Sequence, residues 1–134
     1  MAAKEANGDI SALAQTVKLC GDELTIYSGN DDQITAFMSL GAKGVISVLS
    51  NIAPRAVHDM VKMYLDGDTA ASTELQLKYL DLCSSLFSDV NPIPVKEAMN
   101  MMGMEVGSCR LPLAQIQPQA KEKLRRSLSA FGMI

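Results

Sequence analysis

The sequence predicts a helix-rich α/β fold in which a few strand–helix units are followed by a helical tail. Two observations carry this prediction. In the first half of the chain, short β-branched runs alternate with amphipathic stretches, whereas only helical patterns occur from residue 54 onward. Strand, helix and strand at the spacing seen in the first half form a βαβ unit. We therefore expect parallel strands joined by a right-handed crossover.

The first half contains two predicted helices and two predicted strands. Gly8 or Asp9 can cap a helix that runs through Leu19, and a short apolar run at 24–27 reads as a strand. A second helix, capped by Asn30 or Asp31, follows and stops at Gly41. The run at 44–49 is apolar and β-branched, which is typical of a parallel strand covered on both faces.

The second half shows helical patterns only. Proline favours the first turn of a helix, and three prolines stand at such positions. The predicted helices run from Pro54 to Leu65, from Asp68 or Thr69 to about Phe87, from Pro94 to Met102, and from Pro118 onward.

Composition limits the possible functions. The 134 residues suffice for one ordinary domain, and a net charge of −3 gives no general attraction to nucleic acid. Three widely spaced cysteines do not form a disulfide framework and favour a reducing cytoplasm. None of them has a Cys or His nearby at metal-ligand spacing, so no metal site is expected. No apolar stretch approaches the length of a membrane span.

Lys4 and three later motifs are the candidates for chemistry. A lysine beside Glu5 near a terminus is ordinarily a solvated surface pair. Its alternative role is a Schiff-base amine, which requires a pocket at a strand end that favours the neutral form. The turn Ser28–Asp32 offers capping groups and a glycine that lets a ligand approach the backbone. The run 44–48 and the turn Asn91–Pro94 complete the series, although each motif is weak by itself.

Together and in this order, the motifs resemble the dihydrodipicolinate synthase family, a branch of the class I pyruvate-dependent aldolases and lyases. The resemblance covers the chain from Lys4 to Ile134. It implies an enzyme of lysine and diaminopimelate biosynthesis that condenses pyruvate with aspartate semialdehyde. It implies no cofactor.

The resemblance also implies roles for six residues. Lys4 matches the lysine that forms the Schiff base with pyruvate, and Gly29 and Ile46 match positions that line the pyruvate pocket. Asn30 and Asp31 match the acidic rim where the second substrate enters, although an asparagine stands at the first of the two positions. Asn91 matches a position that faces the active site at the junction with the helical domain.

The family fold is a TIM (β/α)8 barrel followed by a small helical domain. Such a barrel typically needs about 250 residues, so we expect this chain to be the C-terminal half: the last three βα units and the helical domain. Residues 1–53 would form the partial barrel segment, and residues 54–134 the helical region with the final barrel helix. The threonine, tyrosine and arginine residues that complete the family site are then absent, and the chain alone is expected to be inactive.

Two other functions remain open from the sequence. One is a sister pyruvate aldolase such as N-acetylneuraminate lyase, which shares the lysine chemistry. The other is a self-assembling half-barrel module or truncated product without catalysis. Half a barrel exposes sheet edges, so a homo-oligomer paired through these edges is expected.

Other conspicuous residues are expected to have ordinary structural roles. His58 reads as a surface residue, and the basic residues at 121–126 read as a solvated helix face. The methionines between 99 and 104 read as packing residues.

Overall fold

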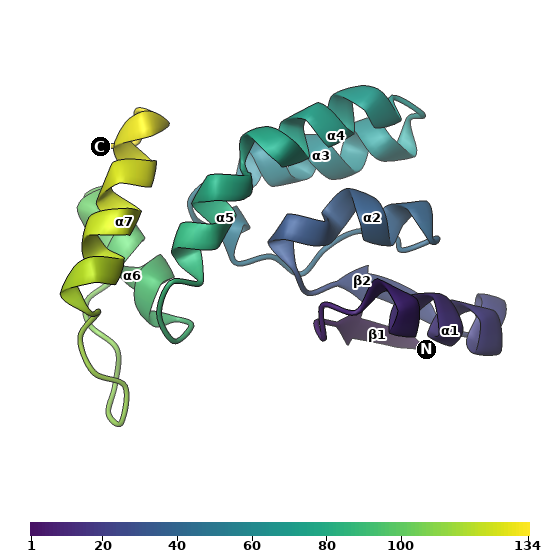
Figure 1. Cartoon of the computed structure of the whole chain (residues 1–134), viewed down its shortest axis with the longest axis horizontal. Coiled ribbons are helices and arrows are strands. Elements are labelled where there is room, and N and C mark those ends of the chain that lie inside the picture. The colour runs from purple at the N-terminus through teal and green to yellow at the C-terminus, as the bar shows by residue number, and fades with distance from the viewer.

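The computed structural model describes residues 1–134. Two short strands lie at one end of the molecule with α1 beside them, and the helices from α2 to α7 lead toward the other end (Figure 1). The strands are β1 (Ala2–Glu5) and β2 (Thr25–Ser28), which pair in parallel. The chain is thus helix-rich, as expected. Its two strands are parallel, but the strand that pairs with β2 is β1 and not the run at 44–49 that the sequence predicts.

The helix between the strands, α1 (Ile10–Cys20), begins where the sequence predicts. The Asp9 carboxylate accepts hydrogen bonds from the Ser11 and Ala12 amides at 2.8 and 3.1 Å, which satisfies two donors that the first turn leaves free. A 3-10 helix, η1 (Gly21–Glu23), then leads into β2.

After β2 the chain forms η2 (Asp31–Gln33) and α2 (Ile34–Ser39). These elements and α1 cover one face of the sheet. A cluster of four buried side chains fills the space between them: Leu13, Ile26, Phe37 and Ala42.

The run at 44–49 does not form the predicted strand. Only Val45 pairs, through one isolated parallel bridge to Ser28. The reason is that side chains take the amides that follow: Asp31 accepts from the Val48 and Leu49 amides, and the Ser47 hydroxyl accepts from Ser50. The chain therefore turns into η3 (Leu49–Asn51) instead of extending along β2.

The remaining helices form the larger part of the structure: α3 (Pro54–Leu65), α4 (Thr69–Lys78), α5 (Leu80–Leu86), α6 (Ile93–Met101) and α7 (Pro118–Ala130). The predicted bounds of α3 are confirmed. The single helix expected from residue 68 to about 87 is wrong, because it is divided at Tyr79. There the Tyr79 ring packs on Phe131, with centroids 4.6 Å apart, and α5 turns away from α3 toward α7.

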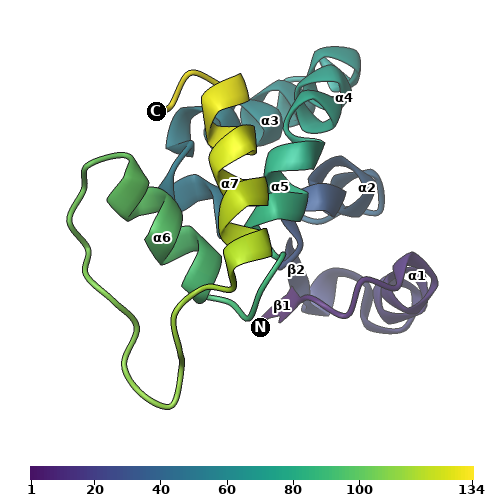
Figure 2. The same cartoon turned by 60° about the vertical axis from the view of Figure 1, so that its left-hand side comes forward.

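One cluster of 15 buried residues joins α2 to α7 and includes Ile34, Met60, Leu82 and Leu128. Met99, Met101 and Met102 pack against it, as expected, whereas Met104 is exposed. Figure 2 shows the long loop between α6 and α7 bowing away from this core. No helix is both long and apolar enough to cross a membrane.

Candidate functional site

The register of the two strands decides which side chains share a face of the sheet. Lys4 lies opposite Tyr27, and Glu5 lies opposite Ser28. Side chains alternate along a strand, so Lys4, Tyr27 and Gly29 lie on one face, while Ile26 and Ser28 lie on the other. Ile26 and Ser28 are buried on the face that the helices cover. Lys4 therefore belongs to the face that the helices leave open.

The bridge between Ser28 and Val45 extends this face to a third segment. Ser28 donates from its amide to the Gly44 carbonyl at 2.9 Å and accepts from the Ile46 amide at 2.8 Å. Because Val45 shares the covered face with Ser28, Gly44 and Ile46 share the open face with Lys4. The structure thus brings together Lys4, Gly29 and Ile46, three of the six expected site residues. We call the residues Lys4, Tyr27, Gly29, Gly44 and Ile46 the lysine face.

Gly29 allows the Lys4 side chain to lie against the backbone at the end of β2 on the open face. A Cβ atom on Gly29 would lie 2.8 Å from Lys4 Cε and 2.5 Å from Ala6 Cβ, which is closer than such atoms approach. The Lys4 side chain therefore extends along the Gly29 backbone. Glycine is required here because a side chain would not fit, and not because of the backbone angle. Gly29 is the only glycine of the chain without a positive φ.

Lys4 does not form the surface pair with Glu5 that its position suggests. The Glu5 carboxylate instead accepts from the Asn7 amide at 2.8 Å, and Lys4 takes part in none of the ion pairs of the chain. Lys4 is exposed, and Ile46 is 49% exposed. The amine is therefore free of protein partners and faces solvent on an uncovered sheet.

The two residues expected on an acidic rim differ in their placement. Asn30 is partly buried, and its amide donates to the Ser28 hydroxyl at 3.1 Å. Asp31 is only 1% exposed and lies behind the lysine face, not on a solvent-facing rim. Its burial raises the pKa of the carboxyl group, and the proximity of the Ser47 hydroxyl and the hydrogen bonds from the Leu49 and Val48 amides offset only part of that shift.

Asn91 lies in the exposed turn between α5 and α6, before a cis peptide bond to Pro92. No hydrogen bond connects Asn91 with the lysine face. Asn91 therefore comes from the helical part of the chain and not from the sheet that carries Lys4.

Sequence reasoning missed Tyr27. This residue is the direct neighbour of Lys4 across the sheet, and a Cβ on Gly44 would lie 3.6 Å from its ring. Its position two residues before Gly29 was the available signal, because alternate residues of a strand share a face.

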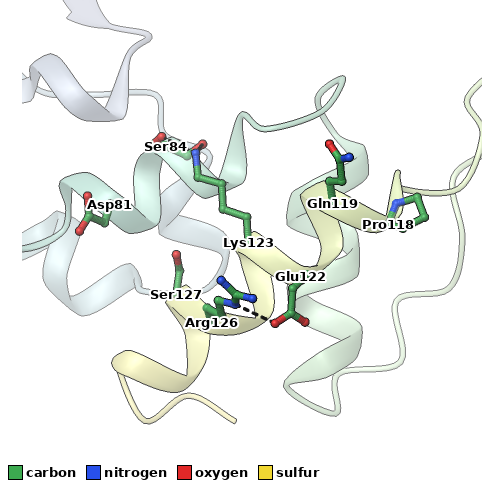
Figure 3. A pocket seen from close by; sticks show the side chains of 8 residues that line it. All are labelled: Asp81, Ser84, Pro118, Gln119, Glu122, Lys123, Arg126 and Ser127. Atoms are coloured by element: carbon green, nitrogen blue, oxygen red, sulfur yellow. Dashed lines mark hydrogen bonds and ion pairs between the residues drawn. The ribbon is translucent and has the colours of Figure 1, made fainter.

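Two surface hollows lie away from Lys4. One of about 710 Å³ between α5 and α7 has only polar and charged side chains and Pro118 at its wall (Figure 3). Its cations already have partners: Lys123 donates to the Ser84 hydroxyl at 2.8 Å, and Arg126 pairs with Glu122. The other lies between α6 and the loop that precedes α7. No group of three or more His, Cys, Asp or Glu side chains is arranged to hold a metal ion.

His58 is confirmed as a surface residue, with a side chain that is 61% exposed and paired with Asp59. The basic residues of α7 are exposed but are not merely solvated. Lys121 pairs with Glu97, and Arg125 and Arg126 both pair with Glu122. These two arginines lower the pKa of Glu122 to about 2.

Comparison with known proteins places this geometry in a family. The model of the Dihydrodipicolinate synthetase family matches residues 1–131. A 4-hydroxy-tetrahydrodipicolinate synthase of Clostridium perfringens is 49% identical over 134 residues, which are 100% of this chain and 46% of that protein. The chain thus spans about half the length of the curated relatives that it matches.

Solved structures agree with this assignment. The dihydrodipicolinate synthase of Aquifex aeolicus superimposes with a TM-score of 0.94 at 38% identity, covering 99% of this chain and 45% of that one. A chloride-inhibited dihydrodipicolinate synthase of Acinetobacter baumannii, complexed with pyruvate, gives a TM-score of 0.91 at 36% identity over 98% of this chain and 45% of that one. From its sequence and its fold, the chain belongs to the dihydrodipicolinate synthetase family.

Proposed function

We propose that this chain carries the imine-forming lysine of a lyase that condenses pyruvate with aspartate semialdehyde in lysine and diaminopimelate biosynthesis. The observation that carries the proposal is the meeting of Lys4, Gly29 and Ile46 on one open sheet face. The names of the relatives support the reaction, and the pyruvate complex of one relative supports the first substrate.

The chemistry assigned to Lys4 is imine formation. Its neutral amine attacks the C2 carbonyl carbon of pyruvate, and the resulting carbinolamine loses water to give the imine. Gly29 would let the lysine stem pass close to its backbone toward bound pyruvate, and Ile46 would contact pyruvate with an apolar surface. We propose Asn30 and Asn91 for the side where the aldehyde substrate enters.

The open face indicates that Lys4 needs a covering partner to react efficiently. Imine formation requires the unprotonated amine, which desolvation favours. Because the relatives are about twice as long as this chain, we propose that residues 1–53 act as a barrel segment and residues 54–134 as a helical region. The part of the relatives that this chain does not match would cover the lysine face. The chain alone is then expected to turn over little substrate.

Borohydride trapping tests this function. The chain is incubated with pyruvate and borohydride, alone and with the separately produced amino-terminal part of the Clostridium perfringens relative, and the adduct is located by peptide mass. We expect a reduced pyruvyl group on Lys4, more abundant in the mixture, and condensation activity in the mixture only. The Lys4→Arg variant should lose both, whereas the matched surface variant Lys18→Arg should keep both. Equal labelling of several lysines, or no label on Lys4 in a mixture that forms a complex, would refute the proposal.

The free edge of β1 supports a second proposal, a homo-oligomer that pairs sheet edges. The Met1 and Glu5 carbonyls accept from the Thr25 and Gly29 amides of β2, so in a parallel ladder the polar backbone groups of Ala2 and Lys4 point outward. An exposed strand edge of this kind pairs readily with another chain. Light scattering over a range of concentrations should show reversible association, and a monomer at all concentrations would refute it.

A further inference from the structure

We infer that Asp31 and Gln76 are positioning residues for the lysine face, because together they hold the turn that follows Ile46. The inference deepens the proposed function and rests on it, since it concerns the geometry of that same face. It differs from the rim role expected for Asp31, which would require an exposed carboxylate.

Asp31 connects two segments that meet beside Lys4. It lies two residues after Gly29, and its Oδ2 atom accepts from the Val48 amide at 2.9 Å and from the Leu49 amide at 2.8 Å. These amides open η3, where a helix start leaves donors unpaired. One carboxylate thus joins the end of β2 to the turn after Ile46.

Ile46 is held between this contact and the sheet. The Ile46 amide itself donates to the Ser28 carbonyl at 2.8 Å. Two residues later, the Val48 amide is fixed by Asp31. Only Ser47 separates the two fixed points, so the backbone of Ile46 has little freedom to move relative to Gly29.

Gln76 anchors Asp31 from the helical part of the molecule. It lies on α4 and is 4% exposed, and its Nε2 atom donates to the Asp31 carbonyl at 2.7 Å. Its Oε1 atom accepts from the Thr35 amide at 3.4 Å, at the start of α2. Both ends of a buried amide are thereby used, and a helix 45 residues away in sequence fixes the segment that follows Gly29.

The burial of Asp31 separates this role from ordinary helix capping. Asp9 and Asp68 also cap helices in this chain, and their hydrogen bonds lie at exposed positions. Asp31 caps from the interior, and its Oδ1 atom is buried without a hydrogen-bond partner. Burying a carboxylate is costly, whereas a cap alone can be made in solvent. The position therefore serves to join β2, η3 and α4, which an exposed cap could not reach.

Amide hydrogen exchange on the 134-residue chain tests the inference without any substrate. Asp31→Ala should accelerate exchange at Val48, Leu49 and also Ile46 by about ten- to hundredfold, because one or two buried donors lose their acceptor. Asp31→Asn keeps an acceptor and should have a smaller effect. Gln76→Met should accelerate the same amides more weakly than Asp31→Ala, since the direct acceptor remains.

Ser72→Ala is the matched control. Ser72 lies on α4 like Gln76, is fully buried and donates its hydroxyl to the Met60 carbonyl at 2.7 Å. Its loss should destabilise the helices without selectively accelerating exchange at Ile46. The inference is overturned if Ile46 exchange stays unchanged in Asp31→Ala while Val48 and Leu49 accelerate. It is equally overturned if Ser72→Ala accelerates the same three amides as much.

A second measurement connects the turn to the chemistry. In the mixture with the amino-terminal part of a relative, Asp31→Asn and Gln76→Met should raise the pyruvate concentration that gives half-maximal trapping at Lys4 about tenfold, while Ser72→Ala leaves it unchanged. These milder variants also carry the test if Asp31→Ala does not fold. Unchanged half-maximal trapping in both would overturn the inference. Absence of any Lys4 adduct in the unsubstituted chain would instead refute the proposed function, and the exchange result would stand separately.

Discussion

The helical part of the chain and its two-stranded sheet differ in how completely they bury their apolar surfaces. In the helical part, 15 residues from α2 to α7 and the segments between them form one closed cluster. The sheet buries a cluster of four residues on one face, and no residue of β1 is buried. The helices therefore share one common core, although Leu65, Leu77 and Phe87 remain exposed, whereas the sheet presents the lysine face to solvent. The candidate chemistry lies on the less complete region.

Truncation of one side chain in each region gives the largest expected contrast. Leu82 is fully buried, so Leu82→Ala should lower the free energy of unfolding by about 2–5 kcal/mol. Ile46 is 49% exposed, and Ile46→Ala should cost about 1 kcal/mol or less. Urea unfolding of both variants at low protein concentration measures the contrast. A loss at Ile46 equal to that at Leu82 would mean that the lysine face is already covered.

Gly29→Ala tests the close approach on the sheet itself. The added Cβ would overlap Ala6 Cβ and Lys4 Cε, so β1 must shift, at a cost of about 1–3 kcal/mol. Because Ala6 Cβ is the nearest atom at 2.5 Å, Ala6→Gly should recover part of this loss in the double variant. Thermal unfolding of the two single variants and the double variant forms the cycle. Simple additivity would show that the overlap with Ala6 is not the cause.

The helical part was also the more predictable one. Pro54 at the first position of α3 and an apolar stripe through Leu65 specify that helix locally, and its bounds follow from the sequence. The break at Tyr79 does not follow from the local sequence. The Tyr79 ring packs there on Phe131, which lies more than 50 residues further along the chain. The same limit applies to the run at 44–49. Its composition favours a strand, but the distant carboxylate of Asp31 takes its amides.

The candidate site was predictable to the extent that it depends on strand order and alternation. Lys4, Gly29 and Ile46 follow from motif order, and the register places them on one face. The burial of Asp31 could not be predicted from the sequence. An aspartate in a strand-to-helix turn is most often a solvated cap, and Gln76, which bonds to the Asp31 carbonyl, lies 45 residues away. Whether the six residues bind substrate stays a prediction.

Proline substitution in β1 distinguishes its paired side from its free edge. Ala3 bonds to β2, and its replacement by proline removes a ladder hydrogen bond, so Ala3→Pro should cost about 1 kcal/mol or more. Ala2 points outward, and Ala2→Pro should cost less while weakening self-association. Unfolding and light scattering of the two variants provide the comparison. Stronger destabilisation by Ala2→Pro would show that the free edge has been assigned to the wrong residues.

The smallest expected effect is a dependence on pH that separates the buried carboxylate of Asp31 from the exposed ones. Burial raises the pKa of Asp31 in the folded chain above the ordinary value of 3.8, and the charge of Asp32 adds to this shift. Between those two pKa values the folded state binds more protons than the unfolded state, so this group favours folding more as the pH falls. Asparagine does not titrate. The stability of the unsubstituted chain relative to Asp31→Asn should therefore rise on acidification from neutral pH toward 3.8.

Asp89 and Glu122 have lowered pKa values and act in the opposite direction, but they are present in both chains and cancel in the difference. Cys83, whose burial raises its thiol pKa to about 12, does not titrate in this range. Urea unfolding of both chains at several pH values gives the difference directly. A difference that falls on acidification would mean that the Val48 and Leu49 amides stabilise the carboxylate more than burial opposes it. In that case Asp31 would hold the turn as a fully charged acceptor at neutral pH, and the connection between the helical part and the lysine face would be stronger than its burial suggests.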